Sequence, residues 1–399
     1  YRPISLTSFL LKTMERLVDL HIRENLEKNT PLHKSQYAYN KGKSTEGALH
    51  FLVSKIEKAH YSKEIALCAF LDIEGAFDNT DYRSIDRALQ NKNIDKPTIG
   101  WVKAMLESRE ISSSLGDVSV SVKALKGCPQ GGVLSPLLWS LVIDDLLVKL
   151  SELGVEVIGY ADDIAVIIPG KFDRTISSIM NQTLNFILNW CRAEGLSINP
   201  SKTIIVPFTN RYKLDLGSIT VEGTNINYSN EVKYLGVVLD KRLNWNSHLK
   251  SVIDKATRAM WACRSLLGRT WGIDSKMIHW MYTMMIRPII TYASLVWWPK
   301  TTQETAKKLL ASLQRQACLS ITGAMRNCPT TAIEAIVGLS PLHVFIWKCA
   351  ARNALKMQIL SNKEYSDFGH MSILRKIPDK DISCSVTDLS LIHISEPTR

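Results

Sequence analysis

Residues 157–168, VIGYADDIAVII, place two adjacent acids, Asp162 and Asp163, between two apolar runs rich in β-branched residues. β-Branched and small residues on both sides of a short polar step favour a strand, a tight turn and a second strand. Two carboxylates held side by side on such a turn repel each other, so their ionisation needs a nearby positive charge. A solvated turn, in which water screens both charges, is the alternative.

A second pair of adjacent acids shows why the strand context matters. Asp144 and Asp145 lie in the segment 135–150, SPLLWSLVIDDLLVKL, where apolar residues recur at helical spacing. One face of such a helix can be buried while both acids reach solvent. The helical pattern therefore suffices to explain that pair, in contrast to the pair at 162–163.

A third acid ends another apolar run. Residues 65–73, IALCAFLDI, form a nearly continuous apolar segment that is typical of a buried strand, and Asp72 lies at its exit. Mg²⁺ prefers one or two carboxylates together with phosphate oxygens, so Asp72 is the natural third ligand beside Asp162 and Asp163. Two metal ions held in this way could support an in-line phosphoryl transfer.

Around these segments, helical and strand patterns are interleaved along the chain. Apolar spacing predicts helices over 7–29, 44–63, 82–92, 135–150 and 175–195. Further strands are expected over 119–126 and 232–240, a turn followed by a strand is expected within 196–208, and the pattern from about residue 245 onward is helical. Interleaved elements with hairpin pairings favour an α+β fold followed by a helical region.

The composition and net charge indicate which kinds of partner the protein could bind. The chain has 399 residues and a net charge of +11, an excess that suits a polyanion such as nucleic acid, although a merely basic soluble protein fits it equally well. No apolar run is long enough to span a membrane, no signal peptide is visible, and no two cysteines form a CxxC pair. We expect an intracellular protein, cytoplasmic and nuclear, without a membrane partner.

Five motifs together resemble those of reverse transcriptases. They are FLDIEGAFD (70–78), GCPQGGVLSPLLW (127–139), YADD (160–163), GLSINPSKT (195–203) and VKYLGVVLD (232–240), in the order seen in that family. The resemblance is strongest to the non-LTR (LINE-type) retrotransposons of an insect-like group. It implies an α+β right-hand polymerase fold with fingers, palm and thumb, and a helical C-terminal region.

The same resemblance divides the chain. It implies reverse transcriptase fingers and palm over 1–244, and a helical thumb and post-polymerase region over 245–360. Residues 361–399 are expected to form a poorly structured tail. Its end, LSLIHISEPTR (389–399), resembles a translated sequencing adapter and is left out of the fold.

Catalytic roles also follow from the resemblance. Asp72, Asp162 and Asp163 match the family's catalytic carboxylates, which bind two Mg²⁺ ions. Lys202 matches a lysine proposed to protonate the leaving pyrophosphate, a task that suits a cation near a triphosphate. A solvated turn lysine is the alternative for Lys202.

Four further residues match positions that contact the incoming nucleotide. Arg2 matches an arginine that grips the triphosphate, for which bidentate contact suits a guanidinium. Phe77 matches a steric gate, a ring under the sugar that excludes a 2′-hydroxyl. Gln130 and Gly131 match a nucleotide-contacting loop, where glycine allows close approach of the backbone. A core aromatic and an ordinary turn are the alternatives for Phe77 and for the loop.

The last matched motif concerns the primer. Tyr234, Leu235 and Gly236 match a hairpin that holds the primer end, and a buried strand is their alternative. The whole resemblance implies an RNA-directed DNA polymerase that extends a primer 3′-hydroxyl with deoxynucleoside triphosphates. Its partners would be an RNA template, a DNA primer and nicked target DNA. An RNA-dependent RNA polymerase and a decayed, inactive copy that only binds nucleic acid are the rival functions.

Overall fold

The computed structural model describes residue 5 and residues 7–264, 274–361 and 368–377. The chain divides into two compact units, one formed by Tyr1–Ala48 with Lys58–Val232 and the other by Leu49–Glu57 with Lys233–Arg399. Helix α2 (Thr45–Tyr61) contributes residues to both units. Each unit is described by itself below.

The first unit is built around an antiparallel sheet. Its five strands are β1 (Ile65–Glu74), β4 (Glu156–Tyr160), β5 (Asp163–Gly170), β6 (Ser197–Ile198) and β7 (Ile204–Phe208). β5 and β7 pair with β1, β4 pairs with the outer side of β5, and β6 pairs with the end of β1. The buried strand expected at 65–73 and the two strands expected around 162–163 are thus confirmed.

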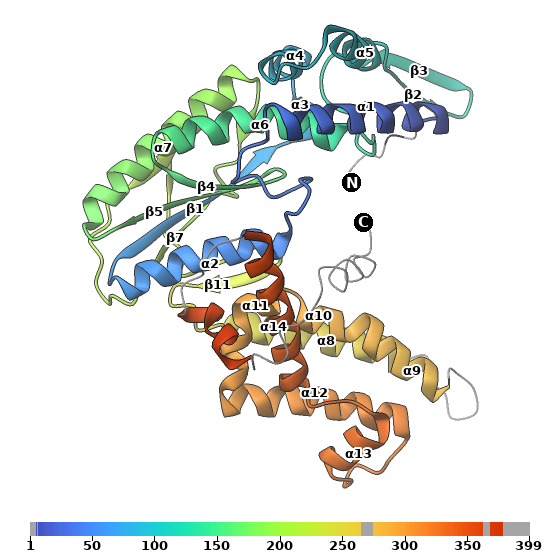
Figure 1. Ribbon diagram of the computed structural model, residues 1–399, viewed down its shortest axis with the longest axis vertical. Coiled ribbons are helices and arrows are strands. Elements are labelled where there is room, and N and C mark those ends of the chain that lie inside the picture. The colour runs from blue at the N-terminus through green and yellow to red at the C-terminus, as the bar shows by residue number, and fades with distance from the viewer. Residues whose placement is uncertain (1–4, 6, 265–273, 362–367, 378–399) are drawn as a thin grey trace. The chain divides into compact units, whose positions relative to one another are not determined.

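Helices cover this sheet. The remaining elements of the first unit are α1 (Phe9–Lys28), α3 (Ala76–Asn79), α4 (Tyr82–Asn91), α5 (Lys96–Glu107), α6 (Ser135–Glu152), α7 (Asp173–Ala193) and the hairpins β2 (Glu110–Leu115) with β3 (Val118–Lys123) and β8 (Ile219–Val221) with β9 (Thr224–Ile226). Figure 1 shows α6 and α7 along one face of the sheet. Alternate residues of β1, from Ile65 to Ile73, enter the hydrophobic core on that side. Ala66, Cys68 and Phe70 on its other face are also buried, which explains the continuous apolar run.

The expectation that both acids of α6 reach solvent is wrong for Asp144. Its side chain is 2% exposed and pairs with Lys92 at 2.6 Å, and it also accepts the backbone N–H of His33 at 2.6 Å. Asp145 is only half-buried and pairs with Lys149. α6 is enclosed on more sides than its apolar spacing suggested, and a charge buried there requires a partner.

Helix α1 is confirmed, but only its C-terminal half has an apolar buried side, formed by Ile22 and Leu26. Phe9 and Leu10 are exposed, whereas Glu15 is only 1% exposed. The Glu15 carboxylate accepts the backbone N–H groups of Val133 and Leu134 at 2.5 and 3.2 Å. These groups precede the first turn of α6, where a negative charge is favourable.

The second unit is mostly helical, as expected from residue 245 onward. Its helices are α8 (Asn246–Arg264), α9 (Ser275–Met281), α10 (Arg287–Thr291), α11 (Ser294–Trp297), α12 (Glu304–Thr322), α13 (Thr330–Val337) and α14 (Leu342–Ser361), with a π-helix over Tyr282–Ile286 and 3₁₀ helices over Trp298–Thr302 and Gly369–Lys376. The segment 232–240 forms two strands, β10 (Glu231–Tyr234) and β11 (Val237–Asp240), rather than one. No single helix in the described parts of the chain is long and apolar enough to cross a membrane, and one bent pair, Thr330–Val337 with Leu342–Ile359, would qualify only by combining its two helices.

The 3₁₀ helix over Gly369–Lys376 was not expected, because it lies in the segment predicted to be a poorly structured tail. His370 within it is fully buried. Its Nδ1 lies 2.8 Å from Glu57 Oε2, and its Nε2 lies 2.7 Å from Nδ1 of His50. Glu57 and His50 are far away in the sequence, so no local pattern in the tail signals this helix.

This cluster predicts a pH effect on stability. Burial, together with the nearby His370, lowers the pKa of His50 from 6.5 to about 3. His50 therefore binds a proton more readily in the unfolded chain than in the folded one. Its neutral form contributes fully to stability above about pH 6.5, and this contribution is lost as the pH falls toward 3. We expect His50→Asn, which cannot titrate, to reduce the loss of unfolding free energy between pH 6.5 and 4 by up to about 3 kcal/mol. Urea unfolding at both pH values measures this difference, and equal losses in both proteins would contradict it.

Candidate active site

The register of the central sheet brings two of the three acids together. Asp72 of β1 lies directly opposite Asp163 of β5. Opposed residues in an antiparallel pair project from the same face, with Cβ atoms about 4.5–5.5 Å apart. This face also carries Phe70 and is turned away from the core under α6 and α7. Asp162 precedes Asp163 in the turn between β4 and β5. All three acids therefore lie at one end of the sheet, although Asp72 is far from the other two along the chain.

The turn itself is held by a helix. Tyr160 pairs with Asp163, which leaves Ala161 and Asp162 as a two-residue hairpin loop. Ala161 has a φ of 55°, a left-handed conformation that costs an L-residue roughly 1–2 kcal/mol. The indole N–H of Trp139, on α6, donates to the Ala161 carbonyl at 2.8 Å. The motif GCPQGGVLSPLLW therefore supplies a support for the motif YADD.

Negative charge accumulates at this end of the sheet. The pKa of the Asp163 carboxyl is raised to about 6, first by burial and then by the charges of Asp162 and Asp72, while Lys202 opposes the shift. Lys202 Nζ donates to Asp72 Oδ2 at 2.7 Å. A single exposed lysine therefore offsets only part of the repulsion among three carboxylates.

The lysine is carried by a short loop between β6 and β7 that is tied to the end of β1. The backbone N–H of Asn199 donates to the Asp72 carbonyl at 3.3 Å. The Asn199 side-chain amide donates to Glu74 Oε1 at 2.6 Å. The backbone N–H of Thr203 closes the loop onto the Asn199 carbonyl. The motif NPSKT thus places Lys202 beside Asp72.

The donor set fits a hard divalent cation. Among the described residues no group of three or more His, Cys, Asp or Glu side chains is arranged as a ready metal cluster. Asp72, Asp162 and Asp163 nevertheless offer only carboxylate oxygens, the ligands that Mg²⁺ prefers. The raised pKa of Asp163 reflects repulsion that a cation would relieve. In the structure Lys202 supplies the positive charge that Asp72 contacts.

The predicted nucleotide-contacting residues lie on two loops that are bonded together. Phe77 is partly buried, with its ring centroid 6.3 Å from that of Trp139. Its carbonyl accepts the backbone N–H of Cys128 at 2.6 Å. Gln130 Nε2 donates to Asp78 Oδ2 at 2.7 Å. Gly131 has a φ of 101°, which only glycine adopts freely. The exposed part of the Phe77 ring leaves both the gate and the core interpretations open.

Sequence reasoning missed the residues that hold these loops. A Cβ at Gly127 would collide with the backbone of Asp78, so the close contact between the loops requires glycine there. The guanidinium of Arg109 contacts the Gly127 carbonyl and donates to the Tyr82 hydroxyl at 2.7 Å. Asp78 belongs to the motif FLDIEGAFD and could have been found there. Arg109 lies outside every motif, and nothing in the sequence marks it.

The remaining predicted residues lie elsewhere. Arg2 falls outside the described residues, so the structure does not place its side chain. Tyr234, Leu235 and Gly236 belong to the second unit, at the end of β10 and in the turn to β11. Tyr234 is buried at 3% exposure, in line with a strand position, while Leu235 and Gly236 form the turn itself.

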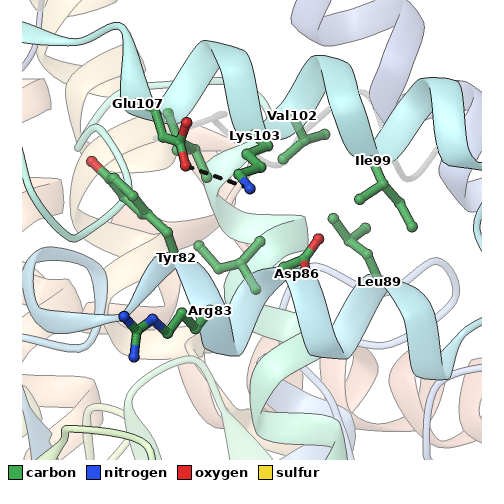
Figure 2. Close-up of a pocket in the computed structure, with 10 residues that line it drawn as sticks. Tyr82, Arg83, Asp86, Leu89, Ile99, Val102, Lys103 and Glu107 are labelled. Carbon is green, nitrogen blue, oxygen red and sulfur yellow. Dashed lines mark ion pairs between the residues drawn. The ribbon is translucent and has the colours of Figure 1, made fainter.

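A separate cavity in the first unit lies between α4 and α5. Its volume is about 170 Å³, and it is lined by Tyr82, Arg83, Ile85, Asp86, Leu89, Ile99, Val102, Lys103, Leu106 and Glu107 (Figure 2). None of the predicted catalytic or nucleotide-contacting residues lines it. It is also smaller than typical ligand pockets, which hold roughly 300–1,000 Å³. The acid cluster is therefore the stronger candidate for the functional site.

The antiparallel sheet thus presents three carboxylates and a lysine at one end, with a glycine-rich loop beside its central strand, the kinds of group that enzymes transferring nucleotides use. Residues 1–239 match the family described as reverse transcriptase (RNA-dependent DNA polymerase), and the chain belongs to this family. The α+β right-hand polymerase fold with a helical C-terminal region, expected from the sequence, is confirmed.

The relatives are proteins of insect retrotransposons. The chain is 25% identical to the putative 115 kDa protein in type-1 retrotransposable element R1DM of Drosophila melanogaster, over 89% of this chain and 34% of the relative. It is 30% identical to the RNA-directed DNA polymerase from mobile element jockey of Drosophila funebris, over 84% of this chain and 37% of the relative. The apo telomerase structure from Candida tropicalis is 11% identical with a TM-score of 0.46, over 96% of this chain and 61% of that one.

These matches confirm the resemblance to non-LTR reverse transcriptases of insects. The chain spans about a third of the length of the curated relatives it matches.

Proposed function

We propose that this chain is the polymerase part of a non-LTR retrotransposon protein and that it extends a primer 3′-hydroxyl with deoxynucleotides on an RNA template. One observation carries the proposal. In a chain of the reverse transcriptase family, Asp72 lies opposite Asp163 beside Asp162, with Lys202 bonded to Asp72. Three acids and one cation at a strand end form the donor set that phosphoryl transfer requires.

The carboxylates and the lysine have different roles in the reaction. Two Mg²⁺ ions, when bound by Asp72, Asp162 and Asp163, supply activation of the primer hydroxyl and stabilisation of the charge on the phosphate oxygens. The primer hydroxyl loses its proton to solvent and its oxygen forms a bond to the α-phosphorus, while the bond from the α-phosphorus to the oxygen of the β-phosphate breaks and pyrophosphate leaves. Lys202 donates a proton to that leaving group as a general acid.

The two bonded loops hold the incoming nucleotide. Phe77 lies under the sugar and excludes a 2′-hydroxyl, while Gln130 and Gly131 contact the nucleotide and Arg2 grips its triphosphate. Support comes from the hydrogen bond between Gln130 and Asp78. A carboxylate only accepts hydrogen bonds, so Asp78 determines which end of the Gln130 amide faces it.

The larger arrangement follows the family. Residues 1–244 act as fingers and palm, 245–360 act as thumb and post-polymerase region, and Tyr234, Leu235 and Gly236 hold the primer end. The partners are an RNA template, a DNA primer, target DNA and deoxynucleoside triphosphates, met in the cytoplasm and the nucleus. The net charge of +11 supports polyanionic partners.

Primer extension by the purified full chain tests this function. We expect extension of a DNA primer on an RNA template with deoxynucleotides, lost on chelation of divalent cations and restored by Mg²⁺. Binding of the primed template without extension would instead favour a non-catalytic nucleic-acid-binding protein. Preferred use of ribonucleotides would favour an RNA-dependent RNA polymerase.

A further inference from the structure

The turn between β10 and β11 contains a leucine in an unfavourable backbone conformation. Leu235 and Gly236 have φ values of 44° and 82°. Two central residues with positive φ are required by a type I′ hairpin turn, for which Asn-Gly is the favoured sequence. A leucine in the left-handed region is strained, and such a conformation persists only where its surroundings impose it.

One side chain supplies that constraint. The Tyr292 hydroxyl donates to the Leu235 carbonyl at 2.8 Å. The Tyr292 ring lies against the next residue, because a Cβ built on Gly236 would be 3.2 Å from ring atom Cε1. Both residues of the turn are therefore held by the same tyrosine.

Tyr292 is itself fixed between α10 and α11. Its carbonyl accepts the indole N–H of Trp297 at 3.0 Å, and Ala293 after it has a φ of 51°. Trp297 is fully buried and packs at 5.5 Å, between ring centroids, against His248. His248 Nδ1 accepts the backbone N–H of Val238 on β11 at 3.3 Å. The hairpin is thus contacted at its turn by Tyr292 and on the following strand by His248.

The same arrangement occurs at the other hairpin with a proposed role. There Ala161, with a φ of 55°, has its carbonyl held by the indole N–H of Trp139. In both hairpins a left-handed residue other than glycine is held at its carbonyl by an aromatic donor. The first of these turns carries catalytic acids, which suggests that accurate turn geometry matters in the second as well.

We propose that Tyr292 is a positioning residue for the primer terminus, acting through the Leu235–Gly236 turn. The inference rests on the proposed function, in which Tyr234, Leu235 and Gly236 hold the primer end. Tyr292 lies in the segment 287–299, RPIITYASLVWWP, to which the sequence assigned no role.

Tyr292→Phe in the full chain tests the proposal, because it removes the hydroxyl and keeps the ring. The net contribution of one hydrogen bond corresponds to a change of about three- to tenfold. We expect the KM for primer–template to rise by that factor, while the KM for the deoxynucleotide and kcat stay within about twofold. We also expect faster amide hydrogen exchange in a peptide spanning 233–240. Tyr228→Phe is the matched control, because it removes a hydroxyl that donates to the Gly217 carbonyl, and it should change none of these values.

A second background separates the turn from other effects of the tyrosine. Asparagine tolerates the left-handed region better than leucine does, so Leu235→Asn should make the constraint less necessary. We expect Tyr292→Phe to change the KM for primer–template by less than about twofold when Leu235→Asn is already present. An equal effect in both backgrounds would show that Tyr292 acts by another route.

The outcomes are distinct. Unchanged exchange over 233–240 in Tyr292→Phe overturns the inference that Tyr292 holds the turn. Faster exchange with an unchanged KM for primer–template overturns its positioning role. A wild-type chain that extends no primer overturns the proposed function, and the positioning role with it, while the exchange data alone still decide whether Tyr292 holds the turn.

Discussion

Asp162→Asn is expected to reduce Mg²⁺-dependent primer extension by roughly a thousandfold or more, equivalent to a loss of about 4 kcal/mol of transition-state stabilisation. The amide keeps the shape of the side chain but removes the charge that would bind a divalent cation in the proposed site. Asp162 lies in a hairpin turn and is half-buried, so the fold should tolerate the change. Its charge is also one cause of the raised pKa of Asp163, so that pKa should fall in the variant.

Asp145→Asn is the matched control for this prediction. It makes the same change at a half-buried acid of α6 that pairs with Lys149 and has no proposed catalytic role. We expect its extension rate to stay within about twofold of the wild type, because the asparagine oxygen can still accept the indole N–H of Trp190 and a partly exposed ion pair contributes little. Steady-state rates at saturating primer–template, with circular dichroism to verify folding, measure both variants. Retention of more than about a tenth of the activity by Asp162→Asn would rule out its role as a metal ligand.

Phe77→Ala is expected to lower the preference for deoxynucleotides over ribonucleotides by roughly tenfold to a hundredfold. Removal of the ring opens the space that a 2′-hydroxyl would occupy. The measurement is the ratio of kcat/KM for a deoxynucleotide to that for the matching ribonucleotide. Phe77 also packs against Trp139, so the variant should lose about 1–3 kcal/mol of stability, and assays belong well below its melting temperature.

Phe77→Tyr separates the two interpretations of this aromatic. It keeps the bulk of the ring, so the selectivity of the wild type should be retained. If Phe77→Ala is destabilised while its sugar selectivity is unchanged, the residue is a core aromatic and the gate lies elsewhere.

The end of the sheet that carries Asp72, Asp162 and Asp163 was predictable because its determinants are local. The continuous apolar run 65–73 indicated a strand buried on both faces, and Asp72 at its exit had one obvious partner in the turn at 162–163. Motif order singled out Lys202, but its 2.7 Å contact with Asp72 was not predicted from the sequence.

Features that depend on distant partners were not predictable. The burial of Asp144 depends on Lys92 and on the backbone of His33. The 3₁₀ helix over Gly369–Lys376 depends on Glu57 in α2. In each case the interacting residues are far apart in the sequence, and neither residue spacing nor composition predicts that they meet.

The pairing of β1 with β5 has a consequence for how such a chain tolerates changes in length. Side chains alternate between faces, so an insertion or deletion of one residue within 65–71 would turn Asp72 toward the core under α6 and α7 and move leucine and isoleucine to the face that carries Ala66 and Cys68. Folding and chemistry would then fail in a single step. The register of β1 thus determines both its core residues and the position of Asp72. A copy with a one-residue deletion there would not persist as a folded but inactive protein.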